Sequence, residues 1–330
     1  MATMPAPLLL LLLLAVIHTS STPLHVPTAP PRPLPPRQFH TPTVEIAPGV
    51  QMPMLGLGTW QYNSSTAGAA AAVALGLGYE LIDTALGYGN QQGIGAALRA
   101  SRRPRTSYFL TSKIPGGLNA TATTAALELC LQQLGLEYVD LMLVHFPADW
   151  GLRNTGTAQR VEQWRAMEAF VAAGKARAIG VSHYCKRHLQ DLMPVTTRPI
   201  AVNQVQFHVG MGQAGPNATD DKAFCEAHGI TYASFSPLCG PCGTTELING
   251  PLVTSIGARH GKTGAQVSLR WQVQQGIPVI PKSQSPKHLK DNLDLFDWAL
   301  TDAEMQALSA AVSPAVAGDG QGNSGDCAVP

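Results

Sequence analysis

The chain has 330 residues, of which 45% are hydrophobic and 13% charged, and its net charge is +1. This much apolar material can bury a sizeable core, and the balanced charge leaves no excess of lysine and arginine for a nucleic-acid surface. The sequence contains no repeat of fixed period that would indicate a solenoid. The composition favours a compact, enzyme-like domain rich in alanine and glycine.

The N-terminus has the pattern of a targeting segment rather than of a folded domain. Residues 8–17 are an apolar run, mostly leucine, too short to span a bilayer and of the length of a signal-peptide core. We assign residues 1–21 to this signal, and 22–43 to a proline-rich linker or to the second half of a two-part organelle presequence. The chain is therefore expected to enter the secretory pathway, to be secreted or lumenal, with a plastid as the alternative. Three N-glycosylation triplets, compatible with secretion, begin at Asn63, Asn119 and Asn217.

From residue 44 onward, strand and helix patterns alternate after an initial hairpin over 44–52. Short apolar runs predict strands, and apolar residues at helical spacing that end at a glycine, as at Gly135, predict helices. The predicted strands are 55–59, 79–82, 107–111, 139–144, 176–181, 200–205, 230–235 and 277–280. The predicted helices are 67–77, 91–99, 123–134, 158–173, 186–192, 221–228 and 263–275, with a last helix beginning near Pro286.

About eight consecutive strand–helix units predict an α/β fold, a (β/α)8 TIM barrel with an N-terminal β-hairpin. The rival is a doubly wound open sheet, which normally has a Gly-x-Gly-x-x-Gly turn after its first strand. Gly56-Leu57-Gly58 lacks the third glycine, so the barrel is favoured. We expect the barrel to span residues 44–312 and a flexible tail to span 313–330.

Polar residues mark the ends of three consecutive predicted strands. Asp83, Lys113 and His145 each follow an apolar run, and Tyr88 lies on the glycine-containing loop after Asp83. Taken singly, Lys113 is best interpreted as a surface lysine and His145 as a core histidine. Because the C-terminal strand ends of a parallel barrel meet at one mouth, their joint placement favours an active site.

These four side chains suit proton delivery to a carbonyl oxygen. A free tyrosine has a pKa of about 10, and a nearby lysine ammonium is expected to lower it. A carboxylate keeps that lysine charged and in position, and a neutral histidine can donate a hydrogen bond to the carbonyl. The set could therefore protonate a carbonyl oxygen while another group delivers hydride.

Two of the six cysteines, Cys239 and Cys242, are closely spaced. A C-x-x-C pair can be a redox pair, a disulfide or half of a zinc site. The second half of a zinc motif is missing, so no metal is expected. A turn is the default interpretation, with a redox or disulfide role as the alternative.

Motifs along the chain resemble those of the aldo-keto reductase family, in the family's order over about residues 44–312. They are Leu55-Gly56-Leu57-Gly58-Thr59-Trp60, Ile82-Asp83-Thr84-Ala85 with Tyr88-Gly89-Asn90, Leu110-Thr111-Ser112-Lys113, Asp140-Leu141-Met142-Leu143-Val144-His145-Phe146-Pro147, Gly180-Val181-Ser182, Asn203-Gln204-Val205-Gln206, Phe235-Ser236-Pro237-Leu238 and Ile280-Pro281-Lys282-Ser283. The resemblance implies a (β/α)8 barrel that binds a nicotinamide cofactor without a Rossmann domain.

The resemblance also implies roles for single residues. The family's catalytic tetrad corresponds to Asp83, Tyr88, Lys113 and His145, with Tyr88 as the general acid. The cofactor would contact Thr59, Ser182, His183, Gln204, Phe235, Ser236, Leu238, Lys282, Ser283, His288 and Asn292. An apolar substrate pocket would be lined by Trp60, Phe146 and Trp150.

Several positions depart from the family pattern. His183 replaces an Asn, and common Glu residues are replaced at Gln91, Gln206 and Asp291. His288 falls where many members place an Arg on the adenosine 2′-phosphate, and histidine is a weaker phosphate partner than a bidentate arginine. Because Lys282 remains, NADPH is expected over NADH. The short tail predicts an open pocket.

The sequence thus predicts an NADPH-dependent aldo-keto reductase that reduces aldehydes or ketones to alcohols. It is expected to be a monomer with a small-molecule carbonyl substrate, no nucleic-acid partner and no stable membrane span. The alternative is a catalytically silent barrel that binds NADPH as a regulatory subunit. A third possibility is a redox-switched protein, in which oxidation of Cys239 and Cys242 disturbs the adjacent cofactor segment.

Overall fold

The hairpin that opens the fold closes one end of a barrel. The computed structural model describes residues 40–149, 156–211 and 221–314. These residues exclude the predicted signal, nearly all of the linker, nearly all of the tail, Trp150 and the triplet at Asn217. All described elements belong to one compact unit.

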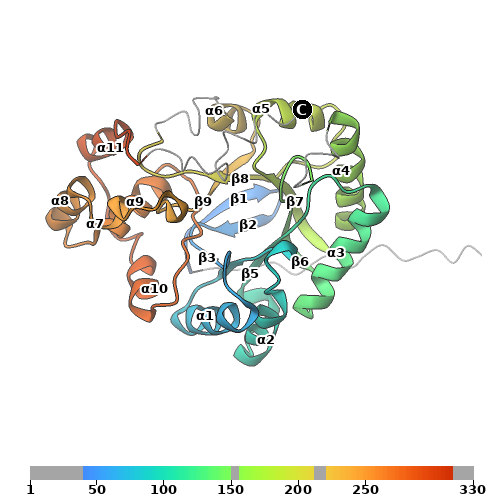
Figure 1. Ribbon diagram of the computed structural model, residues 1–330, viewed down its shortest axis with the longest axis horizontal. Coiled ribbons are helices and arrows are strands. Elements are labelled where there is room, and N and C mark those ends of the chain that lie inside the picture. The colour runs from blue at the N-terminus through green and yellow to red at the C-terminus, as the bar shows by residue number, and fades with distance from the viewer. Residues whose placement is uncertain (1–39, 150–155, 212–220, 315–330) are drawn as a thin grey trace, which may run out of the picture. The chain divides into compact units, whose positions relative to one another are not determined.

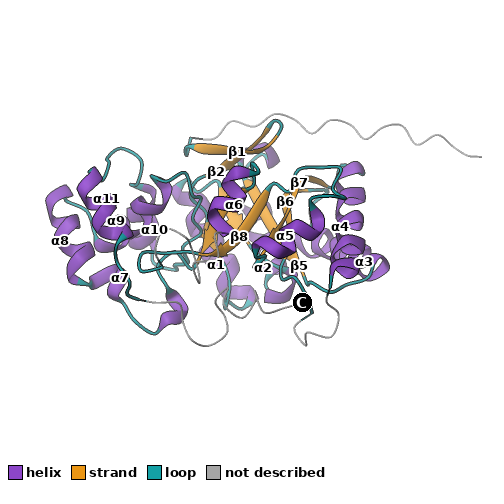
Figure 2. Ribbon diagram, turned by 90° about the horizontal axis from the view of Figure 1, so that it is seen from above, coloured by secondary structure: helices purple, strands orange, loops and turns teal. Residues whose placement is uncertain are grey.

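Strands β1 (Thr43–Ala47) and β2 (Val50–Pro53) pair antiparallel, which confirms the predicted hairpin. Figure 2 shows this hairpin lying across one end of the other strands. Ile46, Val50 and Met52 share an apolar cluster with the first residues of two barrel strands, Leu81 and Phe109. The hairpin therefore covers the end at which the strands begin, which leaves their C-terminal ends for a site.

Seven parallel strands form the barrel wall, each paired with the next in chain order. Helices surround them (Figure 1). The strands are β3 (Leu57–Gly58), β4 (Leu81–Asp83), β5 (Phe109–Ile114), β6 (Val139–Val144), β7 (Ala176–Ser182), β8 (Val202–Gln206) and β9 (Thr231–Phe235).

The predicted eighth strand, over 277–280, is not a regular strand. Val279 instead makes parallel bridges to Leu55 and to Ser234, so this segment joins the first and last strands of the ring. The Gly56 N–H donates to the Val279 carbonyl at 2.9 Å, and the Ser234 N–H donates to the Pro278 carbonyl at 2.8 Å. Pro278 and Pro281 have no N–H to donate, which interrupts a regular ladder. The nearly closed ring nevertheless confirms the predicted fold class.

The helices begin and end close to the predicted residues, with differences set by capping. Asn63 caps α1 because its side chain accepts a hydrogen bond from the Thr66 N–H at 2.8 Å, so the helix begins before residue 67. The sequence prediction missed α7, α8 and α11, and α10 is not the last helix. The helices are α1 (Ser64–Leu77), α2 (Gln91–Ser101), α3 (Ala120–Leu134), α4 (Thr157–Ala172), α5 (Lys186–Leu192), α6 (Asp221–Ala227), α7 (Glu246–Asn249), α8 (Pro251–His260), α9 (Gly264–Val273), α10 (Pro286–Leu293) and α11 (Asp302–Ser309).

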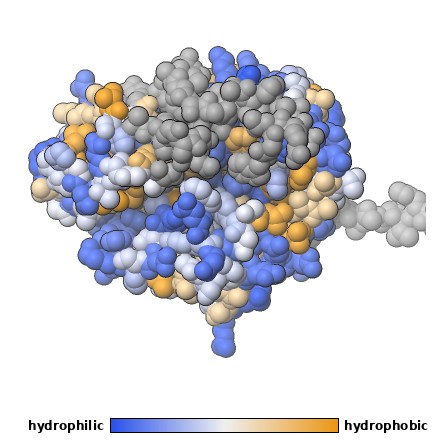
Figure 3. Space-filling view, viewed as in Figure 1, coloured by the Kyte–Doolittle hydropathy of each residue, from blue (hydrophilic) through white to orange (hydrophobic). Residues whose placement is uncertain are grey.

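Polar and apolar residues are interspersed on the described part of the face in Figure 3. The large apolar side chains exposed among the described residues are Leu129, Ile248, Leu252 and Val312. Within those same residues, no helix has the length and hydropathy needed to cross a membrane.

Candidate active site

Four predicted side chains meet at the C-terminal ends of three neighbouring strands. Asp83 is the last residue of β4, and His145 directly follows β6. Lys113 lies inside β5, one residue before its end, rather than after the strand as predicted. Tyr88 ends a short 3-10 helix, η1 (Leu86–Tyr88), on the loop after β4. Because β4, β5 and β6 are neighbours in the ring, these side chains face one mouth.

Asn90, which was not among the predicted site residues, holds the loop that carries Tyr88. Its buried side-chain amide donates to the carbonyl oxygens of Thr59 and Tyr62 at 2.9 and 3.1 Å. Its side-chain oxygen accepts from the Thr84 hydroxyl at 2.8 Å. The loop is thereby tied to the preceding strand–helix unit. The Tyr88-Gly89-Asn90 motif was the sequence signal for this role.

The Lys113 ammonium connects the carboxylate to the phenol. Its Nζ donates to Oδ1 of Asp83 in a buried ion pair, to the Thr84 carbonyl at 3.2 Å and to the Tyr88 hydroxyl at 3.4 Å. A lysine ammonium has three donors, and these contacts use all of them. Lys113 is thus fixed between the strand end and the tyrosine.

His145, which directly follows β6, packs against the Tyr88 ring. The two ring centroids are 5.4 Å apart and the rings are nearly perpendicular, at 72°. Burial, the charge of Lys113 and the proximity of His183 hold the pKa of His145 well below its usual value. The imidazole is therefore neutral at physiological pH and can donate one N–H.

Burial dominates the ionisation of the other three groups. It raises the pKa of Asp83 and lowers the pKa of Lys113, while the attraction between the two charges opposes both shifts. Burial, followed by the Asp83 charge, raises the pKa of Tyr88 well above its usual value. The pKa of Tyr88 is therefore raised rather than lowered as expected, because of burial and then of the Asp83 charge.

Ser182 and Gln204, expected at the nicotinamide carboxamide, lie side by side at the mouth. The Ser182 hydroxyl donates to the Gln204 carbonyl at 2.8 Å. The Gln204 side-chain nitrogen donates to Oδ2 of Asp83 at 2.8 Å. The Gln204 side-chain oxygen is therefore the atom that could accept a hydrogen bond from a carboxamide.

His183, one of the departures from the family pattern, packs on the ring expected to stack on the nicotinamide. Its backbone has a left-handed φ of 60°. Its ring centroid lies 4.7 Å from that of Phe235, with the rings inclined at 33°, and 5.6 Å from that of Phe146. A nicotinamide ring would use the remaining face of Phe235, or the His183 ring would have to move.

Thr59 is buried and positions the strand end rather than opening toward solvent. Its hydroxyl donates to the Asp83 carbonyl at 2.8 Å. Gln91, another departure, is also buried, where its side-chain oxygen accepts from the Ser112 hydroxyl at 2.6 Å. A neutral amide at this position needs no counter-ion.

The residues expected at the adenosine phosphates lie after the eighth barrel segment. Lys282 is exposed; its Nζ donates to the Gln61 side-chain oxygen at 2.9 Å and lies 6.0 Å from the centre of the Trp60 ring. Ser283 is half-buried, and His288 is exposed in the first turn of α10. Asn292 is instead buried, with its side chain beside the Tyr79 hydroxyl.

The loop after β9 contains Ser236, Leu238 and the cysteine pair. Ser236 and Leu238 are half-buried, and Ser236 has a left-handed φ of 47°. Cys239 and Cys242 form a disulfide around the 3-10 turn η4 (Gly240–Cys242). The structure therefore combines the two interpretations that the sequence left open, a turn and a disulfide.

The comparisons with known proteins agree with this fold and arrangement. The profile of the Aldo/keto reductase family matches residues 54–313. An aldo-keto reductase of Mycolicibacterium vanbaalenii is 38% identical over 268 residues, which cover 81% of this chain and 91% of that protein. The glyoxal reductase of Bacillus subtilis is 35% identical, over 81% of this chain and 92% of that protein.

A solved structure shows the same similarity to aldo/keto reductases. The crystal structure of an aldo/keto reductase from Brucella melitensis superimposes with a TM-score of 0.73 and is 34% identical, covering 82% of this chain and 98% of that one. The family profile spans most of the chain, and the relatives are matched over nearly their whole length. The chain belongs to the aldo/keto reductase family.

Proposed function

We propose that this protein reduces aldehydes or ketones to alcohols with NADPH, with Tyr88 as the general acid. Family membership makes it an oxidoreductase that acts on carbonyl compounds, in a family that uses NAD(P)H. One observation carries the finer proposal. The Lys113 ammonium lies between the Asp83 carboxylate and the Tyr88 hydroxyl, 3.4 Å from that hydroxyl.

The ionisation of the four side chains supports the role of Tyr88. Its raised pKa keeps the phenol protonated at neutral pH, so that it holds a proton to give. The neutral His145 can donate a hydrogen bond to a carbonyl oxygen and orient it beside the phenol. As Tyr88 loses its proton, negative charge develops on an oxygen next to the Lys113 ammonium, which stabilises it. The nicotinamide cofactor, when bound, supplies the hydride.

The residues around the mouth suit that cofactor. Gln204 offers an amide oxygen to the carboxamide, and Phe235 offers a ring face to the nicotinamide. Farther out, Lys282 and the two lysines of α10, Lys287 and Lys290, provide positive charge for a phosphate. This charge supports NADPH over NADH.

The substrate is proposed to be a small carbonyl compound. Trp60 and Phe146 are the described members of the expected apolar pocket, and Phe146 lies beside His183 at the mouth. The similarity to a glyoxal reductase supports small aldehydes as the first compounds to test.

The test follows NADPH oxidation against a panel of small aldehydes and ketones, with NADH in parallel. We expect turnover with NADPH and a loss of about 10²–10⁴-fold in kcat for Tyr88→Phe, with NADPH affinity retained. Tyr108→Phe, at the opposite end of β5, is the matched control and should keep full activity. If wild type and Tyr88→Phe both bind NADPH and are equally inactive on every compound, a silent NADPH-binding barrel replaces this proposal.

A further inference from the structure

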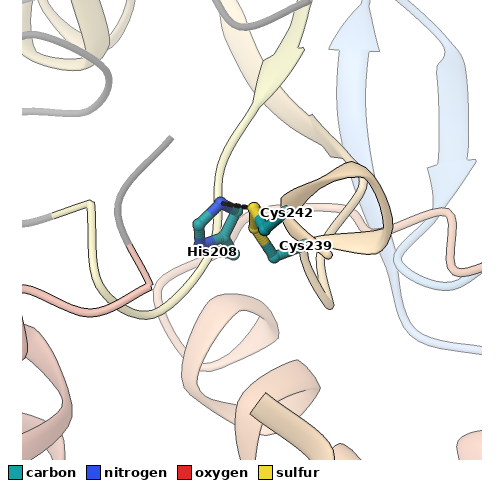
Figure 4. A group of neighbouring side chains, drawn as sticks. All are labelled: His208, Cys239 and Cys242. Carbon is teal, nitrogen blue, oxygen red and sulfur yellow. Dashed lines mark hydrogen bonds between the residues drawn. A yellow bond between two sulfur atoms is a disulfide. The ribbon is translucent and has the colours of Figure 1, made fainter. Parts of the chain in front are cut away.

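A third side chain from another strand lies beside the Cys239–Cys242 disulfide. His208 follows β8, whereas the cysteines follow β9, and Figure 4 shows the His208 ring directed at the sulfur atoms. Nε2 of His208 lies 3.9 Å from Sγ of Cys242. Nε2 and the two sulfur atoms all lie within 4.8 Å of one another. The sequence argument against zinc rested on a missing second half-site, and the fold supplies a further donor from a neighbouring strand.

The His208 ring is held in the form that binds metals. Its Nδ1 lies 2.8 Å from the Val209 carbonyl oxygen, and because that oxygen can only accept, Nδ1 carries the proton. Nε2 then carries a lone pair rather than a proton, and it lies on the side of the sulfurs. Metal-binding histidines are commonly oriented by such a bond from the other ring nitrogen.

Gln206 offers a fourth donor. It is fully buried, and its side-chain nitrogen lies 3.3 Å from Nε2 of His208. Among the described residues, its side-chain oxygen has no hydrogen-bond partner. A half-turn of the amide would place this oxygen 3.3 Å from Nε2 instead. Two ligand atoms on one tetrahedral zinc ion lie about 3.3–3.8 Å apart, given bonds of about 2.0–2.3 Å.

We propose that the reduced form of this pair binds one zinc ion, with Cys239, Cys242, His208 and Gln206 as ligands. Two thiolates and an imidazole on a C-x-x-C scaffold are a donor set that favours Zn²⁺ over harder cations. The site is separate from the Asp83–Lys113–Tyr88–His145 group, so the proposal does not depend on the proposed reaction.

The conversion of the disulfide to the zinc-binding dithiol conserves electrons and protons. A dithiol such as dithiothreitol attacks the disulfide through a mixed disulfide and is itself oxidised to a cyclic disulfide, while two electrons and two protons reach Cys239 and Cys242. Cys242 is partly exposed and Cys239 is buried, so the attack begins at Cys242. Zinc then displaces both thiol protons into solvent. In the oxidised pair no thiolate exists, and zinc is excluded.

The experiment measures zinc uptake by the full-length protein. Protein reduced with dithiothreitol is freed of reductant without oxygen and titrated with zinc chloride against a chromophoric chelator. We expect one zinc per reduced chain and none on the oxidised chain. Cobalt(II) should give a thiolate charge-transfer band with the reduced protein only. Reduced protein that takes up no stoichiometric zinc overturns the proposal.

Variants assign the ligands. Cys242→Ser and His208→Ala should each weaken zinc binding by at least about tenfold, and Gln206→Leu should weaken it less. Cys225→Ser, which changes a free buried cysteine outside the cluster, should bind as wild type does. Far-UV circular dichroism checks folding, and if His208→Ala does not fold, Cys242→Ser at the partly exposed sulfur decides. Zinc binding that survives Cys242→Ser, or that Cys225→Ser abolishes equally, contradicts the assignment.

Discussion

The side chain of Gln204 donates a hydrogen bond to the carboxylate of Asp83, over 2.8 Å and between two strands that are not neighbours. Lys113 binds the other carboxylate oxygen, so both oxygens of this buried group are engaged. The residue proposed to receive the cofactor carboxamide therefore also holds the carboxylate that positions Lys113. Through this one amide, the proposed cofactor site and the proposed proton-delivering group are linked.

Replacing Gln204 should therefore cost stability. Gln204→Leu removes the donor and leaves Oδ2 of Asp83 buried without it, and we expect the free energy of unfolding to fall by about 1–3 kcal/mol. Urea denaturation measures this. Gln92→Leu, at an exposed position of α2, should change the same quantity by less than about 0.5 kcal/mol. Equal losses in the two variants would show that the hydrogen bond contributes nothing specific.

Removing the cation of the buried ion pair should have a larger effect. Lys113→Met leaves the Asp83 carboxylate buried without a counter-charge, and we expect a loss of about 3–5 kcal/mol in unfolding free energy. Adding Asp83→Asn removes the uncompensated charge and should restore part of this loss. Lys175→Met, which breaks the partly exposed pair with Glu128, should cost at most about 1 kcal/mol. Guanidinium denaturation measures the unfolding free energy of the Lys113→Met, double and Lys175→Met variants. A double variant less stable than Lys113→Met would contradict the argument.

Most of the barrel could be predicted because its strands are apolar runs separated by amphipathic helices. β6 and α5 have the predicted bounds. The prediction of a regular eighth strand was wrong because two prolines in this segment interrupt the hydrogen-bond ladder. Three helices were missed, of which α7 is a single short turn. Their sequences lack a distinct apolar stripe bounded by strands.

Some residues of the site could be predicted from local sequence patterns, whereas other contacts join residues far apart in the sequence. Asp83, Lys113 and His145 could be found because each lies at the end of an apolar run, a signal within a few residues. The Gln204–Asp83 hydrogen bond joins residues 121 apart in the sequence. The approach of His208 to Cys242 likewise depends on β8 and β9 being neighbours. Such contacts follow from the register of the ring, which no local pattern contains.

Buried neutral histidines should make the protein less stable in mild acid. Burial lowers the pKa of His208 from 6.5 to about 4, and it shifts the pKa of His145 in the same direction. Between these pH values the unfolded chain binds a proton that the folded chain does not, so stability is lost as the pH falls through 6.5. His208 should account for a loss of about 1–2 kcal/mol between about pH 7 and pH 5.

Urea midpoints at pH 7, 6 and 5 measure this dependence. His208→Gln should flatten the curve, and His288→Gln, at an exposed position, should leave its slope unchanged. A His208→Gln curve as steep as that of wild type would assign the acid sensitivity to other groups.

The state of the cysteine pair should also affect cofactor affinity. The disulfide directly follows the segment that contains Ser236 and Leu238. Ser236 and Cys239 both have left-handed backbone angles, at φ 47° and 53°, which non-glycine residues adopt only when the surroundings enforce them. Reduction removes a constraint on this loop, so we expect NADPH to bind several-fold more weakly to the reduced protein with a zinc chelator present.

Fluorescence titration with NADPH before and after reduction gives both affinities. The double variant Cys239→Ser/Cys242→Ser, measured without reductant, should bind NADPH as weakly as the reduced protein does. Equal affinities in oxidised and reduced wild type would remove this link between the disulfide and the cofactor segment. The proposed reaction would be unaffected by that result.

The last prediction concerns the 2′-phosphate that distinguishes NADPH from NADH. His288 is exposed in the first turn of α10, where the family resemblance places a phosphate-binding arginine. A guanidinium can bind a phosphate through two parallel hydrogen bonds, so His288→Arg should lower KM for NADPH several-fold and change KM for NADH by less than about twofold. Lys175→Arg, directly before β7 and therefore at the opposite end of the barrel, keeps its charge and should alter neither value. If His288→Arg changes KM for both cofactors equally, His288 does not face the 2′-phosphate, and the proposed preference for NADPH would depend on the lysines alone.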